Sequence, residues 1–349
     1  MQRTVRFFVA AAAIGVTAMP AFAQVYPERL AESARHVREA YQRRDRGDSN
    51  RSQAVDRFSR TVRIGSDGTL DVSNIAGDIV VSRGSGSEAK IDVVRTARGR
   101  DDADAKEQLS LTRVDINEGN GRAEVRERYP ERNGNSNRRS WNVTTDFTIT
   151  APEGTHLILK SVSGSLKVTG ITGDVSMETV SGDVQLSSGG RVTTAKSISG
   201  NVQVSDTKFD GSLDASSVSG DVRLQRVTAR RVSIGSVSGN VRLEDVQSDR
   251  VDAHTTSGNA NFDGSLAKNG RYELKSFSGE VRLALAGNTG FELEASSFSG
   301  DVHSDFPITT HGSSDERRGR RRSLSGTYGD GSAVLNVSTF SGSVVISKR

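Results

Sequence analysis

Apolar and polar residues alternate along most of this chain from Phe58 onward, and this period of two indicates β-strands with one buried face. One motif recurs through the C-terminal two thirds: Ser or Thr, an apolar residue, Ser, Gly, a polar residue and a second apolar residue. Up to Gly300 the motif glycines follow one another every 18 to 21 residues, at positions 164, 182, 200, 220, 239, 258, 279 and 300, and a ninth follows at 342. A repeat of this length predicts coils that stack and bury one another.

The phase of the alternation changes inside each unit. In the unit of Gly220, Leu213 and Ala215 share one phase, whereas Val222 and Leu224 share the other. A strand cannot exchange its buried face without a bulge or corner, so we expect a bend at the Ser-Val step of every unit. The hydroxyl residues suit such a corner because they bond nearby backbone groups, and the glycine permits a tight backbone approach.

The second motif residue predicts a ladder of equivalent side chains along the stack. We expect this ladder to face inward at the corner, and its change from aliphatic to aromatic predicts an interior that widens towards the C-terminus. Its members are Val162, Val180, Ile198, Val218, Val237, Thr256, Phe277, Phe298 and Phe340.

The fold class expected is therefore all-β: a β-solenoid of ~20-residue coils over residues 151–349, with an N-terminal β-rich capping region over 58–150. Within the cap, residues 74–79 are a degenerate first repeat, and 101–111 are expected to form a short helix. Residues 312–322 are an Arg-rich insertion before the last coil.

The first residues have the layout of a secretory signal peptide. Arg3 and Arg6 precede an apolar run, Phe7–Met19, which is too short to span a bilayer, and a small-x-small site ends at Ala23. We expect cleavage after Ala23, export to the periplasm or the cell exterior, and a polar leader over 24–57, either flexible or carrying a docking helix. No later segment is apolar enough to predict a transmembrane helix.

The composition narrows the chemistry. The chain has no cysteine, which excludes disulfides, thiol catalysis and thiolate metal sites. It has 36 glycines but only 5 prolines, which fits a recurring glycine rather than collagen or a disordered linker. The net charge of +4 is too small to imply nucleic-acid binding.

The residue after each motif glycine forms an outward column of acids and amides that includes Asp183, Asp221 and Asp301. Such oxygens are candidate ligands for calcium or sugars, but they also suit a turn that faces water. Arg223 and Arg242, two residues further on in their units, are expected to neutralise acids of adjacent coils. These five residues are the candidate binding surface on the coils.

The insertion supplies the remaining candidates for the binding surface. Its five arginines, opposed by two acids, suit an anionic ligand, but a solvated loop is the favoured interpretation because no aromatic residue interleaves with them. They are Arg317, Arg318, Arg320, Arg321 and Arg322.

Residues 146–155 (DFTITAPEGT), the following LILKSVSG at 157–164 and the later Ser-Val-Ser-Gly-Asp-Val repeats resemble the DUF4097 family of bacterial β-strand-repeat proteins, which is provisionally described as an adhesin family. The resemblance runs from about Asn74 to the C-terminus. It implies the repeat fold and no catalytic residues. The Arg-rich insertion and the weak repeat with Thr256 and Ala260 depart from the pattern.

These observations favour a non-catalytic exported protein that presents a repetitive surface to a protein or polysaccharide of the cell envelope. No catalytic, cofactor or metal residue is predicted, because acids that recur in most coils define a surface rather than one site, and the five histidines are scattered. A carbohydrate-active β-helix enzyme is one alternative. A scaffold that self-associates end to end is the other.

Overall fold

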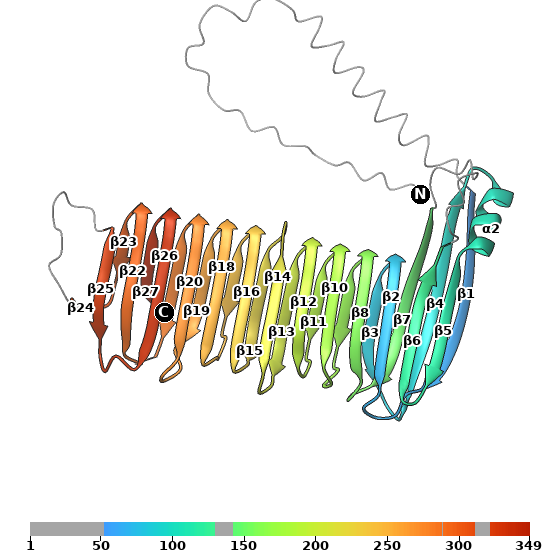
Figure 1. Ribbon diagram of the computed structural model, residues 1–349, viewed down its shortest axis with the longest axis horizontal. Coiled ribbons are helices and arrows are strands. Elements are labelled where there is room, and N and C mark those ends of the chain that lie inside the picture. The colour runs from blue at the N-terminus through green and yellow to red at the C-terminus, as the bar shows by residue number, and fades with distance from the viewer. Residues whose placement is uncertain (1–51, 130–141, 288, 311–321) are drawn as a thin grey trace, which may run out of the picture. The chain divides into compact units, whose positions relative to one another are not determined.

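The computed structural model describes residues 52–129, 142–287, 289–310 and 322–349, which form one compact unit of two long sheets (Figure 1). The predicted signal peptide, the leader up to residue 51 and most of the Arg-rich insertion lie outside the described residues. Within the described residues, each coil contributes one strand to each sheet. The β-solenoid fold expected from the repeat is confirmed.

Sheet 1 has 13 strands in the described residues. Their order is β1 (Ser52–Arg63), β4 (Glu88–Gly99), β7 (Val143–Pro152), β3 (Ile79–Gly84), β9 (Leu166–Thr169), β11 (Val184–Ser187), β13 (Val202–Lys208), β15 (Val222–Thr228), β17 (Val241–Glu244), β19 (Ala260–Ser265), β21 (Val281–Ala286), β27 (Val344–Lys348) and β23 (Val302–Ser304).

Sheet 2 has 14 strands in the same part of the chain. Their order is β24 (Thr309–Thr310), β25 (Ser323–Tyr328), β22 (Phe291–Ser299), β26 (Ala333–Ser341), β20 (Arg271–Ser278), β18 (Arg250–Ser257), β16 (Arg231–Ser238), β14 (Ser212–Ser217), β12 (Val192–Ser199), β10 (Val175–Ser181), β8 (His156–Ser163), β2 (Thr69–Ala76), β6 (Arg122–Arg128) and β5 (Arg113–Gly119).

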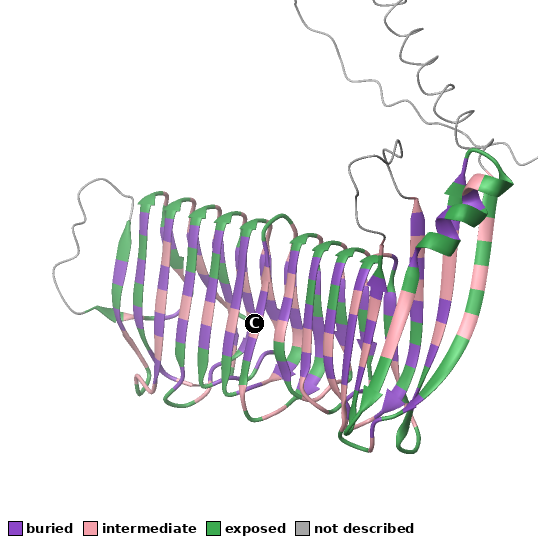
Figure 2. Ribbon diagram, turned by 45° about the vertical axis from the view of Figure 1, so that its right-hand side comes forward, coloured by how far each residue is buried: buried purple, intermediate pink, exposed green. Residues whose placement is uncertain are grey.

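Neighbouring coils pair in parallel and keep the motif in register. Ser217 pairs with Ser236 in sheet 2, and Val222 pairs with Val241 in sheet 1. The register places equivalent apolar side chains above one another, so the interior consists of inward ladders from both sheets, visible as the buried bands of Figure 2. The repeat thus provides the core that no single coil could bury alone.

The predicted phase change is present at the corner between the two sheets. Before the corner, Leu213, Ala215 and Ser217 are buried, and after it the buried positions are Val222 and Leu224. The bend itself occupies the intervening residues.

The predicted inward ladder at the second motif position is wrong. Its eight apolar members are 44 to 64% exposed, and Thr256 is exposed as well. The side chain points outward because it continues the alternation of the sheet 2 strand, in which the preceding Ser or Thr is buried. In β16, for example, the strand runs through Val237 to Ser238, and Ser236 points inward. Consequently its phenylalanines cannot widen the core. The eight are Val162, Val180, Ile198, Val218, Val237, Phe277, Phe298 and Phe340.

The last coil in sequence is not the last coil in space. β26 lies between β20 and β22, and β27 lies between β21 and β23. After β20 and β21 the chain leaves the next position in the stack open and forms β22 and β23 beyond it. It then returns through the antiparallel β24 and β25, and β26 and β27 occupy the open position. The C-terminal strands are consequently paired on both sides.

The N-terminal strands form the cap that the sequence predicts. The degenerate repeat is the first coil, since β2 and β3 pair in parallel with β8 and β9. Beyond it, β7, β4 and β1 extend sheet 1, β6 and β5 extend sheet 2, and the helix α2 (Asp102–Leu111) packs on β4 and β1. β1 begins at Ser52, inside the range expected for the leader.

Candidate functional site: an exposed apolar ladder at the coil corner

The first motif residue, Ser or Thr, fixes the corner by a side-chain hydrogen bond. Ser236 Oγ donates to the carbonyl oxygen of Gly220 in the preceding coil at 2.9 Å, and Ser217 Oγ donates to Gly200 at 2.8 Å. Equivalent bonds join Thr179, Ser197, Thr255, Ser276, Ser297 and Thr339 to the glycine of the neighbouring coil. Because these hydroxyls are buried, they satisfy carbonyl groups that water reaches poorly at the corner.

The motif glycine allows the coils to stack closely. A Cβ on Gly239 would lie 2.1 Å from the carbonyl oxygen of Gly220, and a Cβ on Gly220 would lie 2.1 Å from that of Gly200. The missing side chain would therefore point at the neighbouring coil rather than into the interior. Any larger residue would force the coils apart.

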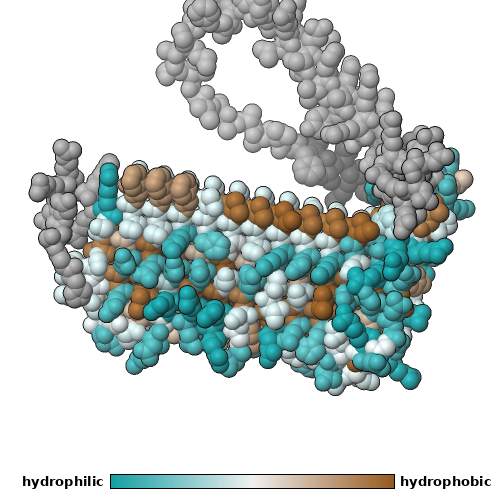
Figure 3. Space-filling view, in the orientation of Figure 1, coloured by the Kyte–Doolittle hydropathy of each residue, from teal (hydrophilic) through white to brown (hydrophobic). Residues whose placement is uncertain are grey.

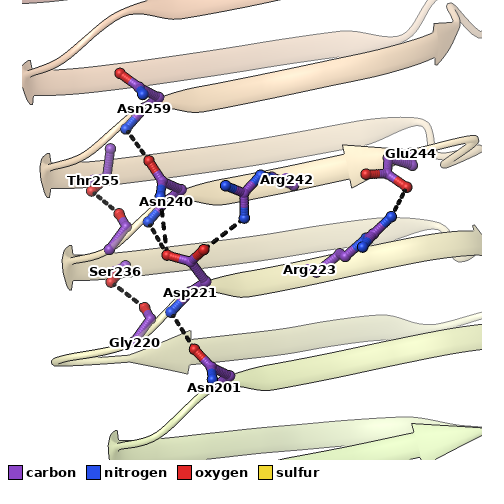
Figure 4. Close-up of polar contacts among 11 residues, drawn as sticks. Asn201, Gly220, Asp221, Arg223, Ser236, Asn240, Arg242, Glu244, Thr255 and Asn259 are labelled. Carbon is purple, nitrogen blue, oxygen red and sulfur yellow. Dashed lines mark hydrogen bonds and ion pairs between the residues drawn. The ribbon is translucent and has the colours of Figure 1, made fainter. Parts of the chain in front are cut away.

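The outward column after the glycine is part of the same framework. Asp221 Oδ1 accepts a hydrogen bond from the backbone N–H of Asn240 at 2.8 Å, and Asn240 Oδ1 accepts one from Asn259 at 3.0 Å (Figure 4). Asp183 Oδ1 does the same for Asn201 at 2.8 Å. These side chains satisfy the amide of the next coil, so stacking explains most of the column and a ligand is not needed to explain it.

The arginines pair with acids of adjacent coils, as predicted. Arg242 Nη1 lies 2.6 Å from Asp221 Oδ2, and Arg223 Nη2 lies 2.5 Å from Glu244 Oε2. Burial works to raise the pKa of Asp221, but hydrogen bonds from the Asn240 amide and the Arg242 guanidinium outweigh it, and the pKa lies below its usual value. Asp183, Asp221, Arg223 and Arg242 therefore lie in neighbouring coils and already have partners.

The other candidates are separate from this group. Asp301 is exposed at the start of β23, near the C-terminal end of the stack. Arg322 is exposed, and its backbone carbonyl accepts a hydrogen bond from the N–H of Ser297 at 2.7 Å. Arg317, Arg318, Arg320 and Arg321 lie outside the described residues. Among the described residues, Asp301 and Arg322 therefore lie apart from the group of Asp183, Asp221, Arg223 and Arg242.

The most prominent apolar surface is the exposed ladder at the second motif position, which we call the corner ladder. In spatial order its members are Ile75, Val162, Val180, Ile198, Val218, Val237, Thr256, Phe277, Phe340 and Phe298. Figure 3 shows it as an almost unbroken apolar row along one edge of the stack, interrupted at Thr256. Exposed apolar rows of this length are uncommon on soluble proteins and mark interaction sites.

The aromatic end of the corner ladder is tightly ordered. The Phe340 ring stacks on Phe277 with centroids 4.9 Å apart and on Phe298 with centroids 4.6 Å apart, and the planes are parallel to within 4°. The two faces of the Phe340 ring are therefore covered by its neighbours, and its edge points to solvent.

A groove follows the corner ladder on the outer face of sheet 2. One stretch of about 820 Å³ runs from Lys160 to Thr256, and a second of about 720 Å³ continues beside the phenylalanines. The two stretches share His254 and Thr256. At mid-length the groove is lined by the small residues Ser216 and Gly235, and the His254 ring lies over Gly235, where an added Cβ would be 2.4 Å from His254 Nε2. Charged residues lie towards both ends: Lys160, Glu178, Lys196 and Lys275.

Two kinds of feature receive no support within the described residues. No group of three or more His, Asp or Glu side chains there could hold a metal ion. None of the helices in that part of the chain has the length and apolar character needed to cross a membrane.

A family model described as Toastrack DUF4097 matches residues 69–347. The chain belongs to the Toastrack DUF4097 family. The matched range begins at β2, the first coil of the stack, and ends in β27, so it contains the whole corner ladder from Ile75 to Phe298. Family membership confirms the resemblance seen in the repeats. No curated protein matches this Toastrack chain.

Several solved structures resemble this Toastrack protein at low identity. A protein of Bacteroides fragilis described as a "putative adhesin" is 13% identical, with a TM-score of 0.40, and the match covers 84% of this chain and 97% of the other. A "putative cell adhesion protein" of Clostridium sporogenes is 11% identical, with a TM-score of 0.25 and coverage of 85% and 100%. A "putative lipid binding protein" of Parabacteroides distasonis is 10% identical, with a TM-score of 0.37 and coverage of 84% and 97%.

The corner ladder is the feature that the sequence prediction placed wrongly. The available signal was the uniformity of the second motif position, which is apolar in every Toastrack repeat but that of Thr256. A uniformly apolar position is typical of a core, which is why the pattern alone predicts an inward ladder. An outward position that keeps apolar side chains through so many coils instead indicates a surface that is covered by something else.

Proposed function

We propose that this chain is a non-catalytic, exported binding protein whose binding site is the corner ladder and the groove beside it. The observation that carries this proposal is the row of eight apolar side chains held 44 to 64% exposed in one straight line. Exposing such a row to water promotes non-specific association, so a binding role is the physical reason for keeping it.

The shape of the row favours a protein partner over a polysaccharide. Aromatic residues that hold sugars offer a ring face, but both faces of Phe340 are covered by Phe277 and Phe298. Apart from Thr256, the remainder of the corner ladder is aliphatic and has no polar side-chain atoms. A protein surface with apolar residues of its own matches this chemistry better.

The two alternatives receive less support. A carbohydrate-active enzyme needs two free carboxylates around the scissile bond, whereas the Asp183 and Asp221 carboxylates accept hydrogen bonds from neighbouring coils. An end-to-end scaffold needs matching ends, whereas one end of sheet 1 is the long, arginine-bearing β1 and the other is the three-residue β23.

Export follows from the N-terminal sequence. We propose that residues 1–23 are a signal peptide removed after Ala23, because a basic start, a short apolar run and Ala-Phe-Ala occur in the required order. The binding domain proper would be residues 151–349 together with the first coil, β2 and β3, which adds Ile75 to the corner ladder. The other strands of the region 58–150 would close this end of the stack.

The test is a sedimentation assay with labelled mature protein and separated envelope fractions. An Ile198→Asp variant should lose most of the bound protein, at least about tenfold, because a buried unpaired carboxylate opposes any apolar interface. A Gln203→Asp variant, which adds the same charge on the opposite sheet, serves as the control and should bind like the parent. Equal binding by both variants would contradict the assignment of the site.

A further inference from the structure

We infer that the partner of the corner ladder is a second copy of this chain, packed antiparallel about a two-fold axis between Val218 and Val237. This inference rests on the proposed function, in which the corner ladder is the binding surface. The partner is then a protein surface identical to the corner ladder, held in an antiparallel orientation.

The spacing of the corner ladder selects a partner of the same kind. Its ten positions follow one another at the strand spacing of ~4.8 Å and extend over ~43 Å. A helix presents apolar residues at steps of about 5.4 Å per turn, so it loses register within a few coils. Another corner ladder keeps register along the whole length.

The heights of the side chains match only when one copy is reversed. With the axis between Val218 and Val237, the aromatic end of one copy faces the aliphatic end of the other: Phe277 lies opposite Val180, Phe340 opposite Val162 and Phe298 opposite Ile75. Thr256, the polar member, lies opposite Ile198. Each phenylalanine thus meets an aliphatic residue and the two valines at the axis meet each other, which keeps the distance between the two copies nearly uniform.

The floor of the groove has the same symmetry. The residues nearest the axis, Ser216 and Gly235, are small and face each other across the two copies, and the His254 ring of the same chain covers Gly235. An interface that is self-complementary in this way is what a two-fold dimer requires.

The charges also favour the reversed arrangement. Glu178 of one copy lies opposite Lys275 of the other, which also pairs with Glu273 in its own chain. Lys196, which is paired with Asp214 in its own chain at 2.7 Å, lies opposite His254. In a parallel dimer each of the charged residues Lys160, Glu178, Lys196 and Lys275 would face its own counterpart. Four like-charge contacts would oppose that arrangement.

The area is sufficient for a stable dimer. The exposed parts of the corner ladder amount to roughly 700 Å² per copy, and the flanking groove adds to this. Specific interfaces bury about 800 Å² per partner. A small apolar ligand would be much shorter than the corner ladder and could cover only a fraction of it.

Single-cysteine variants test the geometry, because the natural chain has no cysteine. Val162→Cys and Phe340→Cys proteins are treated with a short bis-maleimide, first separately and then as an equal mixture. The antiparallel dimer predicts cross-linked dimers in the mixture only, since each single cysteine lies about seven coils, or ~34 Å, from its own counterpart. Sedimentation velocity should show the parent as a dimer at about 50 µM, a Val218→Arg variant with at least tenfold weaker association and a Gln203→Arg control unchanged.

Two results would overturn the inference. Cross-linking of each variant alone would show a parallel dimer. A monomeric parent at that concentration, with no cross-linking in the mixture, would show that no second copy binds. In the latter case the envelope assay still decides the proposed function, because loss of binding by Ile198→Asp then reports a different partner.

Discussion

Phe277 and Phe340 stack face to face, with ring centroids 4.9 Å apart, although the coil that contains Phe298 lies between them in the sequence. The contact exists because the C-terminal coil is inserted between two earlier ones. The last residues of the chain are therefore interior strands of both sheets, and the coil of Phe298 can complete its pairing only after the chain has returned.

Engineered disulfides distinguish this order from the order of the sequence. Ser278 and Ser341 are paired in register on adjacent strands and are both exposed, so a Ser278→Cys/Ser341→Cys protein should form an intramolecular disulfide on mild oxidation. In Ser278→Cys/Ser299→Cys the two positions are about two strand spacings apart, beyond the reach of a disulfide. Mass spectrometry of the oxidised proteins gives the answer, and a disulfide in the second protein alone would contradict the inserted coil.

Replacement of a motif glycine should destabilise the stack. Gly239→Ala places a methyl group 2.1 Å from the Gly220 carbonyl oxygen, and the expected loss in free energy of unfolding is at least about 2 kcal/mol. Gly119→Ala, at a site with open space around the added carbon, is the matched control and should change the free energy by less than about 1 kcal/mol. Urea unfolding measures both, and similar values for the two would argue against close stacking at the corner.

The corner hydroxyl should contribute through its hydrogen bond. Ser236→Ala leaves the Gly220 carbonyl without its side-chain donor in a buried place, and we expect a loss of about 1–3 kcal/mol in the free energy of unfolding. Ser236→Thr should be tolerated, because Thr255 and Thr339 hold the equivalent place in other coils. Ser238→Ala, at an exposed serine two residues away, should have little effect. Equal losses in the free energy of unfolding for Ser236→Ala and Ser238→Ala would show that the hydrogen bond from Ser236 to Gly220 does not stabilise the corner.

A buried carboxylate at the cap should make stability depend on pH. Glu127 accepts hydrogen bonds from Thr145 Oγ1 at 2.5 Å and from the Ile75 amide at 2.9 Å, and burial raises its pKa above the usual value. The folded state therefore holds the proton more strongly than the unfolded state, so this group's contribution to stability falls as pH rises from the unfolded pKa through the folded one.

Glu127→Gln removes this titration. The free energy of unfolding of the variant, relative to the parent, should increase between about pH 4 and pH 7, as followed by urea unfolding across that range. Glu118→Gln, at an exposed acid of β5, is the control and should show no such trend. A relative stability of Glu127→Gln that decreases with pH would contradict the burial argument.

The coil, its corner and the cap could be predicted from the sequence because each rests on local evidence. The phase change between Ala215 and Val222 and the hydroxyl before it are properties of a few consecutive residues. The predicted direction of Val218 is wrong because it extends the phase of Val222 back across the corner. The strand that ends at the buried Ser217 places Val218 outward. The position of the last coil in the stack could not be predicted either, because a repeat shows that the coils are equivalent but not which coils are neighbours. Glu127 becomes buried only through packing of the cap on the first coil.

The most direct test of the account compares Ile198→Asp with Val202→Asp, at a protein concentration low enough for the parent to be monomeric. The two residues lie four positions apart on opposite sides of one corner, and Ile198 is 48% exposed whereas Val202 is 1% exposed. The measurement is the free energy of unfolding in urea. The expected result is a change within about 1 kcal/mol for Ile198→Asp and a loss of more than about 3 kcal/mol for Val202→Asp. Equal and large losses would show that the corner ladder belongs to the core after all.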